Sequence, residues 1–306
     1  MVLGKNVHAY IVANILLLPL INLNSEIVEL VVNIIAAIGI MTVGLAHGAI
    51  DNLLYGVQPG QSSRSFSIRY TSVIIGFSLL WLVFPNIAML LFLVTSAYHF
   101  GQSQHIEYNL QPLVYSRALF LVWGGIILQL LFYFHGHEIL ALGDIHTQII
   151  PVLNHLIYYA LHYLILFVSV YVLLFAKMLH ANQQPAYHFF KELYILGIIT
   201  TSMYLFHGFL SATLFFVFIH SLKVMFQEFE HARNNWSVTS IIDFLRLFIP
   251  LSVASIAIVA VVILCIYSLE FSHLVSYILI ILLSSVTVPH SFVMDKFYAV
   301  MFINNE

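Results

Sequence analysis

Charged side chains are scarce in this chain, because Asp, Glu, Lys and Arg together make up only 8% of its 306 residues. Soluble domains carry roughly a quarter of such residues, whereas 61% of this chain is hydrophobic. The scarcity of charge therefore excludes an ordinary soluble domain. It predicts that residues 1–306 form a single integral-membrane domain.

Cysteine and basic residues are also few. The single cysteine, Cys265, excludes an internal disulfide framework. Ten basic residues and a net charge of −3 leave no basic surface for nucleic acid, so no nucleic-acid partner is expected. The sequence also contains no P-loop, no dinucleotide-binding motif and no Ser-His-Asp nucleophile elbow. These gaps remove the commonest enzyme classes from consideration.

Long apolar runs, separated by polar or proline-containing breaks, predict an all-α, polytopic transmembrane helix bundle. About ten helices are expected, with eight to ten as the range, because about 20 apolar residues cross a bilayer. The first run, Ile11 to Leu23, is interpreted as an uncleaved helix, since no small-residue cleavage site follows it. The other helices are predicted at about 27–51, 67–84, 87–104, 118–134, 152–176, 193–206, 208–226, 244–268 and 274–298.

Ten crossings would place all ten lysines and arginines on one side of the bilayer. Basic residues in short loops mark the cytoplasmic face. The pattern therefore predicts a multi-pass protein of the cell membrane with both termini in the cytoplasm. One miscounted helix would scatter the basic residues over both sides, so this distribution favours the count of ten.

Histidine is unusually common, with 16 residues against ten lysines and arginines. Four histidines end apolar runs near the predicted cytoplasmic ends of their helices: His47, His99, His220 and His290. An ionisable group at membrane depth is costly and usually functional, and imidazole binds iron, zinc and copper. The matched depth predicts that these four histidines meet at one metal ion. The alternative is that each packs separately against a neighbouring helix.

Polar neighbours of two of these histidines are candidates for a supporting role. Asp51 stands four residues after His47, on the same face of a helix, and could steady its second nitrogen or its bound ion. A boundary aspartate facing water is the alternative for Asp51. Gln102 shares a helix face with His99 and is predicted to orient it, and Tyr98 adjoins it, although Gln102 could be a plain polar residue at a helix end.

The remaining histidines have more ordinary interpretations. His155 and His162 share a face of the predicted helix 152–176, toward the other side of the membrane. They are interpreted as packing residues, with a haem or proton-path role as the alternative. A solvated loop is predicted to hold His135, His137 and His146.

Four short motifs resemble those of the Brp/Blh family of membrane β-carotene 15,15'-dioxygenases, in the same order. The motifs are His47-Gly48-Ala49-Ile50-Asp51, Tyr98-His99-Phe100-Gly101, His220-Ser221-Leu222-Lys223 and Pro289-His290-Ser291-Phe292-Val293-Met294. The resemblance implies cleavage of the central double bond of β-carotene by O₂, yielding two retinal. It also implies a Fe²⁺ cofactor and a functional link to a rhodopsin.

The chain departs from the family pattern at the third motif. Family members often read His-Ser-x-Arg-His there, and Lys223 and Val224 stand at the last two of these positions. The second histidine of that motif is implicated in iron binding in the family. Here His47, His99, His220 and His290 could still complete a four-histidine site.

Two other functions are compatible with the sequence. The chain could be a non-enzymatic carotenoid- or retinal-binding partner of a rhodopsin, or a haem-binding membrane protein with histidines on facing helices. A retinal photoreceptor is disfavoured, because the only lysine near a late helix, Lys296, lies at the membrane boundary rather than deep within it. Absorbance of the purified protein would separate these functions.

Overall fold

A computed structural model of the protein describes residues 3–21, 23, 25–44, 46–55, 62–108, 113–143, 148–181, 186–236, 238–268 and 275–303. Within these ranges the chain is almost entirely helical, with thirteen α-helices and several short 3₁₀ and π turns, and it contains no strand. The predicted all-α fold is therefore confirmed.

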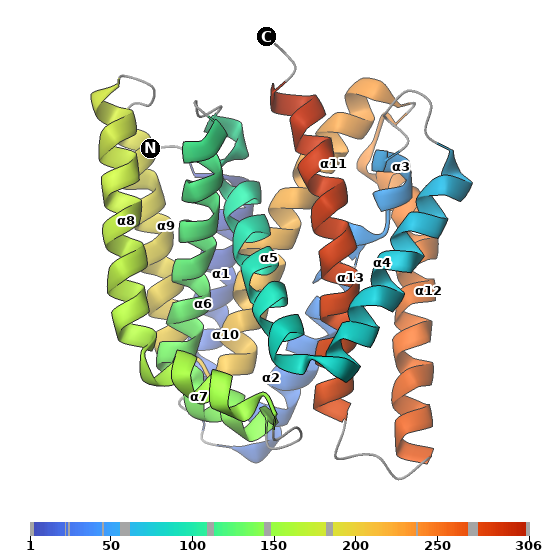
Figure 1. Ribbon diagram of the computed structural model, residues 1–306, viewed down its shortest axis with the longest axis horizontal. Helices are drawn as coiled ribbons and strands as arrows, with labels where there is room; N and C mark the ends of the chain where they lie inside the picture. The colour runs from blue at the N-terminus through green and yellow to red at the C-terminus, as the bar shows by residue number, and fades with distance from the viewer. Residues whose placement is uncertain are drawn as a thin grey trace.

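The long helices run alternately up and down, so that both ends of the chain lie at the same end of the bundle (Figure 1). Their bounds are α1 (Lys5–Ile21), α2 (Glu26–Gly39), α4 (Ser63–Val83), α5 (Pro85–His105), α6 (Leu113–Gly143), α8 (Ala160–His180), α9 (Ala186–Leu205), α12 (Ile241–Ser268) and α13 (Val275–Tyr298). One further continuous run is built from α10 (Gly208–Leu214), a π-helix (Phe215–Ser221) and α11 (Leu222–Asn235). The short helices are α3 (Asp51–Tyr55) and α7 (Ile150–Tyr158).

Six of the described helical segments are long and apolar enough to cross a membrane, and a bent pair in α12 would make a seventh. Large apolar side chains on the outside of the bundle are well exposed, including Leu16 at 69%, Leu82 at 72% and Ile27 at 73%. Such a surface suits lipid rather than water, and it indicates a membrane protein. Thirteen helices are compatible with the predicted bundle, while the number of ten crossings stays a prediction.

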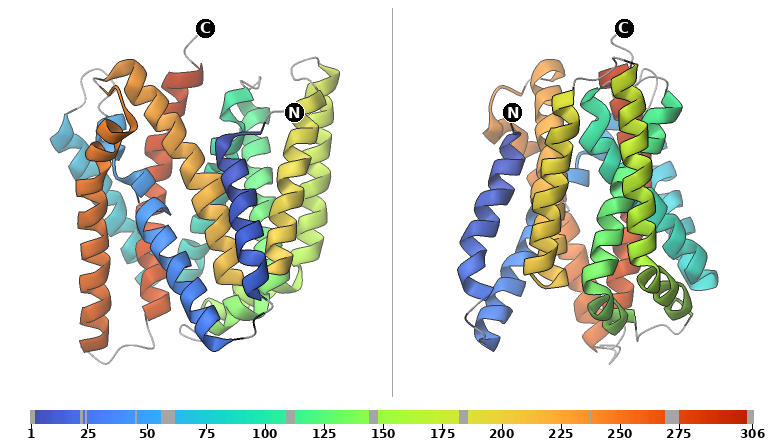
Figure 2. Two further views of the ribbon diagram at one scale, coloured as in Figure 1. Left: turned by 180° about the vertical axis from the view of Figure 1, so that it is seen from behind. Right: turned by 90° about the vertical axis from the view of Figure 1, so that its left-hand side faces the viewer.

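Three predicted elements differ from the structure. The predicted helix 27–51 is interrupted, because α2 gives way to a π turn (Ile40–Gly44) and then a 3₁₀ turn (Ala46–Gly48). The predicted helix 152–176 is two helices, α7 and α8, that meet at Tyr159. Helix α7 lies across the end of the bundle opposite the termini (Figure 2). The third difference concerns the loop predicted after residue 134.

His135 lies inside α6, not in a solvated loop. The helix bends there, with φ −125° and ψ 20°, and then continues to Gly143. The His135 ring is buried, with Nδ1 2.9 Å from a Glu138 carboxylate oxygen and Nε2 2.8 Å from the Met203 carbonyl oxygen. These bonds satisfy both ring nitrogens and explain why the residue is inside. His137 also lies in α6 rather than in a loop, although it is exposed, and His146 lies outside the described residues.

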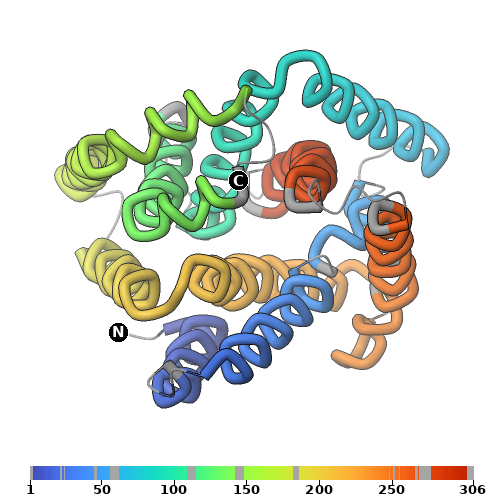
Figure 3. Tube along the Cα trace, turned by 90° about the horizontal axis from the view of Figure 1, so that it is seen from below, coloured from blue at the N-terminus to red at the C-terminus, as the bar shows by residue number. Residues whose placement is uncertain are grey.

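The backbones of α5 and α6 touch through two glycines. A Cβ atom added to Gly101 would lie 1.8 Å from the Phe120 carbonyl oxygen, and one added to Gly124 would lie 1.8 Å from the Ala97 carbonyl oxygen. Only glycine permits this approach, so the two helices are fixed in one register. Viewed along the helices, α13 lies between α5 on one side and the α10–α11 run on the other (Figure 3).

A candidate metal centre

Four buried histidines are supplied by four separate elements. His47 comes from the 3₁₀ turn after α2, His99 from α5, His220 from the π-helix and His290 from α13. Two of these positions depend on π-helical turns, one just before His47 and one containing His220. Such turns insert a residue and re-aim a side chain, and they occur frequently at functional sites.

The structure brings all four predicted histidines together. Ring centroids are 4.7 Å apart for His47 and His290, 4.7 Å for His99 and His220, 4.9 Å for His99 and His290, and 5.2 Å for His47 and His220. The rings of each pair are close to perpendicular, with interplanar angles of 80° to 89°. One ring nitrogen from each of His47, His99 and His220 lies within 4.8 Å of the other two.

Three of the rings are held from behind through Nδ1. That atom contacts the Gly44 carbonyl oxygen in His47, lies 3.1 Å from Ser103 Oγ in His220 and 2.8 Å from Asp51 Oδ1 in His290. The Ser103 hydroxyl donates its proton to the Phe100 carbonyl at 2.9 Å, so its oxygen accepts from His220. Each Nδ1 is therefore a donor, which leaves the lone pair of a neutral ring on Nε2.

The inward nitrogens lack partners. Among the described residues, Nε2 of His220 and of His290 and both ring nitrogens of His99 are buried with no hydrogen-bond partner. An unpaired buried acceptor costs about 1–3 kcal/mol, and several gathered in one place are a marked exception to normal packing. Lone pairs that converge from neutral imidazoles are the donor set of a transition-metal site.

Asp51 supports a different histidine from the one predicted. It was expected to steady His47 across one helical turn, but its Oδ1 accepts from His290, and its Oδ2 accepts a 2.9 Å bond from the Tyr70 hydroxyl. The prediction assumed one continuous helix. The 3₁₀ turn at Ala46–Gly48 ends before α3 begins at Asp51, so the two side chains do not follow a helical repeat.

Gln102 and Tyr98 both form hydrogen bonds with Asp295. The Gln102 amide donates to Asp295 Oδ1 at 2.8 Å, and the Tyr98 hydroxyl donates to the same atom at 2.9 Å. Gln102 does not orient His99, whose two ring nitrogens have no hydrogen-bond partner in the described part of the chain. Asp295 was not predicted from the sequence, although it lies five residues after His290 and follows directly on the fourth motif.

Aromatic rings cover one flank of the histidine cluster. The Phe216 ring stacks on His220 at 5.5 Å and 23° and meets His47 at 5.6 Å. The Phe100 ring meets His220 at 4.8 Å. Val224, the position where the chain departs from the family motif, is 0% exposed and packs in an apolar cluster with Ile50 and Met294.

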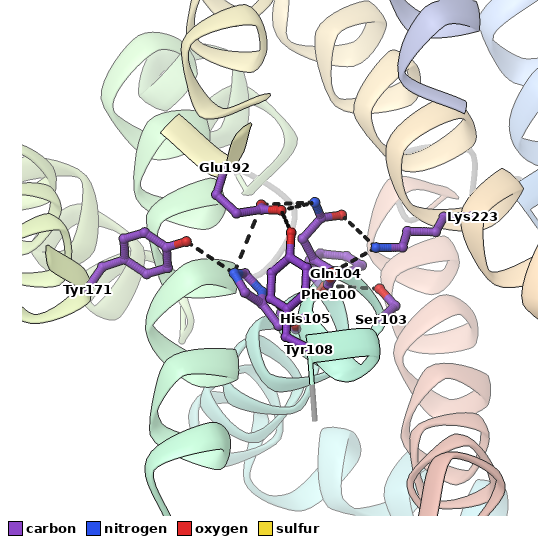
Figure 4. A network of polar contacts seen from close by, with 9 residues as sticks. Phe100, Ser103, Gln104, His105, Tyr108, Tyr171, Glu192 and Lys223 are labelled. Atoms are coloured by element: carbon purple, nitrogen blue, oxygen red, sulfur yellow. Dashed lines mark hydrogen bonds and ion pairs between the residues drawn. The ribbon is translucent and has the colours of Figure 1, made fainter. Parts of the chain in front are cut away.

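A second buried polar cluster adjoins the end of α5 that carries His99 (Figure 4). The buried Glu192 carboxylate accepts bonds from Gln104 Nε2 at 2.9 and 3.0 Å and from the Tyr108 hydroxyl at 2.6 Å. Lys223 Nζ donates to the Gln104 carbonyl at 2.7 Å. These bonds tie α5 to α9 and α11, and no motif in the sequence indicated them.

His155 and His162 do not join either cluster. Both are exposed, on α7 and the first turn of α8. His155 Nε2 lies 3.0 Å from the Tyr163 hydroxyl, a bond within the α7–α8 segment itself. This placement makes the two residues useful controls for the four buried histidines.

Together these features define a helical membrane protein with a buried four-histidine cluster. The family model described as Beta-carotene 15,15'-dioxygenase matches residues 38–298, a range that contains all four histidines. The chain therefore belongs to the β-carotene 15,15'-dioxygenase family. Searches of curated proteins and of solved structures found no match.

Proposed function

We propose that this protein is an iron-dependent dioxygenase that cleaves the central double bond of β-carotene with O₂ to give two molecules of retinal. The observation that carries the proposal is the convergence of buried, unpartnered imidazole nitrogens inside the family-matched range. A rhodopsin would use the retinal made in this way, so we propose a functional link between this protein and a rhodopsin.

The four histidines fit an iron ion by their chemistry. His47, His99, His220 and His290 would hold it through neutral imidazole nitrogens, which are suitable ligands for iron. Iron in this position would supply the redox chemistry with O₂, while the protein supplies binding and orientation. Gly44, Ser103 and Asp51 keep three of the rings turned inward.

The surroundings of the cluster suit a hydrocarbon. Phe100 and Phe216 present aromatic faces beside His220 and would exclude water from the reacting bond. β-Carotene dissolves in the bilayer core, so it would reach these rings laterally, between helices, without crossing water. Holding its central double bond beside the four histidines is the positioning role assigned to the protein.

The activity can be tested by co-expression in a bacterium that makes β-carotene, with retinal measured by chromatography. The unchanged protein should give retinal, and His47→Ala, His99→Ala, His220→Ala and His290→Ala should each abolish it. His155→Ala and His162→Ala are matched controls that should keep most of the yield. If the two control variants lost as much retinal yield as the four test variants, the four-histidine cluster would not be the specific site of the reaction.

Bound iron separates this function from its alternatives. Purified protein should hold about one iron per chain, and each of the four alanine variants should lose it. A Soret band would indicate a haem protein, and a carotenoid or retinal spectrum without turnover would indicate a binding partner. The perpendicular packing of imidazoles about 5 Å apart favours ligands gathered around one ion over ligands on two faces of a haem.

A further inference from the structure

A pocket of about 110 Å³ lies between α4 and α13, beside α3. The two long helices pack together. They are joined toward the end opposite the termini by the Ser78–Ser285 hydroxyl contact at 3.0 Å and by the Trp81 Nε1 bond to Ser284 at 2.8 Å. The pocket is lined by Tyr55, Phe66, Arg69, Tyr70, Val73, Pro289, Phe292, Val293 and Lys296.

Two cationic side chains of this pocket, Arg69 and Lys296, both contact Tyr55. Arg69 Nη1 donates to the Tyr55 hydroxyl at 2.9 Å, and Lys296 Nζ lies 5.1 Å from the centre of the Tyr55 ring. In the described part of the chain, neither cation has a carboxylate within ion-pair distance. Two like charges gathered without a counter-charge repel each other, so the pocket favours an anion.

Two carboxylates that neighbour pocket residues in the sequence form their hydrogen bonds with other groups. Asp295, the residue before Lys296, accepts from Tyr98 and Gln102. Asp51, close to Tyr55 in sequence, accepts from His290 and Tyr70. Neither carboxylate therefore forms a direct ion pair with Arg69 or Lys296.

Charge and apolar surface are separated along the pocket. Val73 lies one turn farther into α4 than Arg69, and Pro289 lies about two turns farther into α13 than Lys296. The direction of both helices puts the cations toward the end of the bundle that holds the chain termini (Figure 1). A phospholipid in the adjoining leaflet has the same order, with a phosphate at the boundary and acyl chains below it.

We propose that this pocket binds an anionic phospholipid, with its phosphate between Arg69 and Lys296 and an acyl chain against Val73 and Phe292. Basic side chains near a membrane surface attract anionic lipid, and the apolar lining supplies the contact for the chain. This inference does not depend on carotene cleavage, because none of the pocket residues is a proposed iron ligand.

Native mass spectrometry of the full-length protein tests the proposal, with phosphatidylglycerol and phosphatidylcholine supplied in equal amounts. The unchanged protein should retain phosphatidylglycerol in preference to phosphatidylcholine. The Arg69→Gln/Lys296→Gln variant should lose this retention roughly 30-fold, as expected for two cations at a membrane surface. Val73→Trp, which fills the pocket without changing charge, should also weaken it.

The matched control is Lys5→Gln/Arg64→Gln, which removes one lysine and one arginine that are exposed at the same end but do not line the pocket. This control should retain the lipid. Equal retention by the Arg69/Lys296 variant, equal loss in the control, or no preference for the anionic lipid would overturn the proposal. Displacement of the lipid by millimolar inorganic phosphate would also overturn it, since a free anion would then suffice.

Discussion

A single carboxylate, Asp51, sets the orientation of His290 by accepting a hydrogen bond from its Nδ1. The substitution Asp51→Asn keeps the size of the side chain but removes the charge that favours this arrangement. Loss of such a support typically costs 10–100-fold in metal affinity. We expect iron titration of the purified Asp51→Asn variant to show a decrease of that order.

A matched control for this change is Asp243→Asn, at the start of α12. Among the described residues, its carboxylate bonds to Ser240, Thr239 and Arg246, all within four residues of it. Iron affinity of the control should be unchanged. If Asp51→Asn bound iron as tightly as the control, the contact between Asp51 and His290 would have no role in the metal centre.

The residues that could be predicted from the sequence are those whose signal is local. Each of the four histidines ends an apolar run, and counting the helices is enough to place all four at the same depth in the membrane. The partners of Gln102, Asp51 and Glu192 could not be predicted in this way, because each bond joins elements that are far apart in the chain. Such pairs depend on how the helices pack against one another, and the periodicity within a single helix does not reveal that packing.

At the scale of elements, the contact between α5 and α6 controls where His99 lies. Gly101→Ala would place a methyl group against the Phe120 backbone, and the rigid backbone cannot move aside as a side chain could. Overpacking of this kind costs about 1–3 kcal/mol or more. We expect Gly101→Ala to lower the thermal unfolding midpoint in detergent and to reduce bound iron.

Gly76→Ala provides the comparison, since an added Cβ there meets nothing within 4 Å. Alanine is favoured over glycine inside a helix by about 1 kcal/mol, so this variant should unfold at the same or a higher temperature. A Gly101→Ala protein that matched it in stability and iron content would show that the two helices can separate without harm.

The π turns explain why helix bounds were predicted better than side-chain partners. A hydrophobic pattern with a period of 3.6 residues predicts that residues 27–51 form a helix, and most of that segment is helical. It does not reveal the extra residue that a π turn inserts at Ile40–Gly44. Nor does it reveal that the 3₁₀ turn at Ala46–Gly48 ends before α3 begins. His47 and Asp51 therefore do not follow one helical repeat, which is why Asp51 meets His290 and not His47.

At the scale of the whole molecule, the alternating helices place both termini at one end (Figure 1). If all ten predicted helices cross the bilayer, that end is cytoplasmic by its basic residues. Reporter fusions after Ser62 and after Gln183 should report cytoplasm, and a fusion after Asp144 should report the opposite side. Gln183 and Asp144 lie outside the described residues.

A cytoplasmic signal at Asp144 would contradict the ten-crossing topology. The helices and their alternating direction can be predicted from the sequence, because a lipid environment requires long apolar helices, and these leave a clear pattern of apolar runs. The way those helices pack together leaves a weaker pattern in the sequence. The ring of His135, at the bend in α6, contacts the distant Met203 carbonyl, and Leu153 of α7 packs in a cluster with Phe77 and Trp81 of α4.

The two oxygens of Asp51 connect the histidine cluster with the pocket between α4 and α13. Oδ1 accepts from His290, and Oδ2 accepts from Tyr70, which lines the pocket between α4 and α13. If a ligand in that pocket shifts Tyr70, the energy of the His290 contact changes with it. Thermodynamic linkage then requires reciprocity: whatever factor the lipid imposes on iron affinity, iron must impose on lipid affinity.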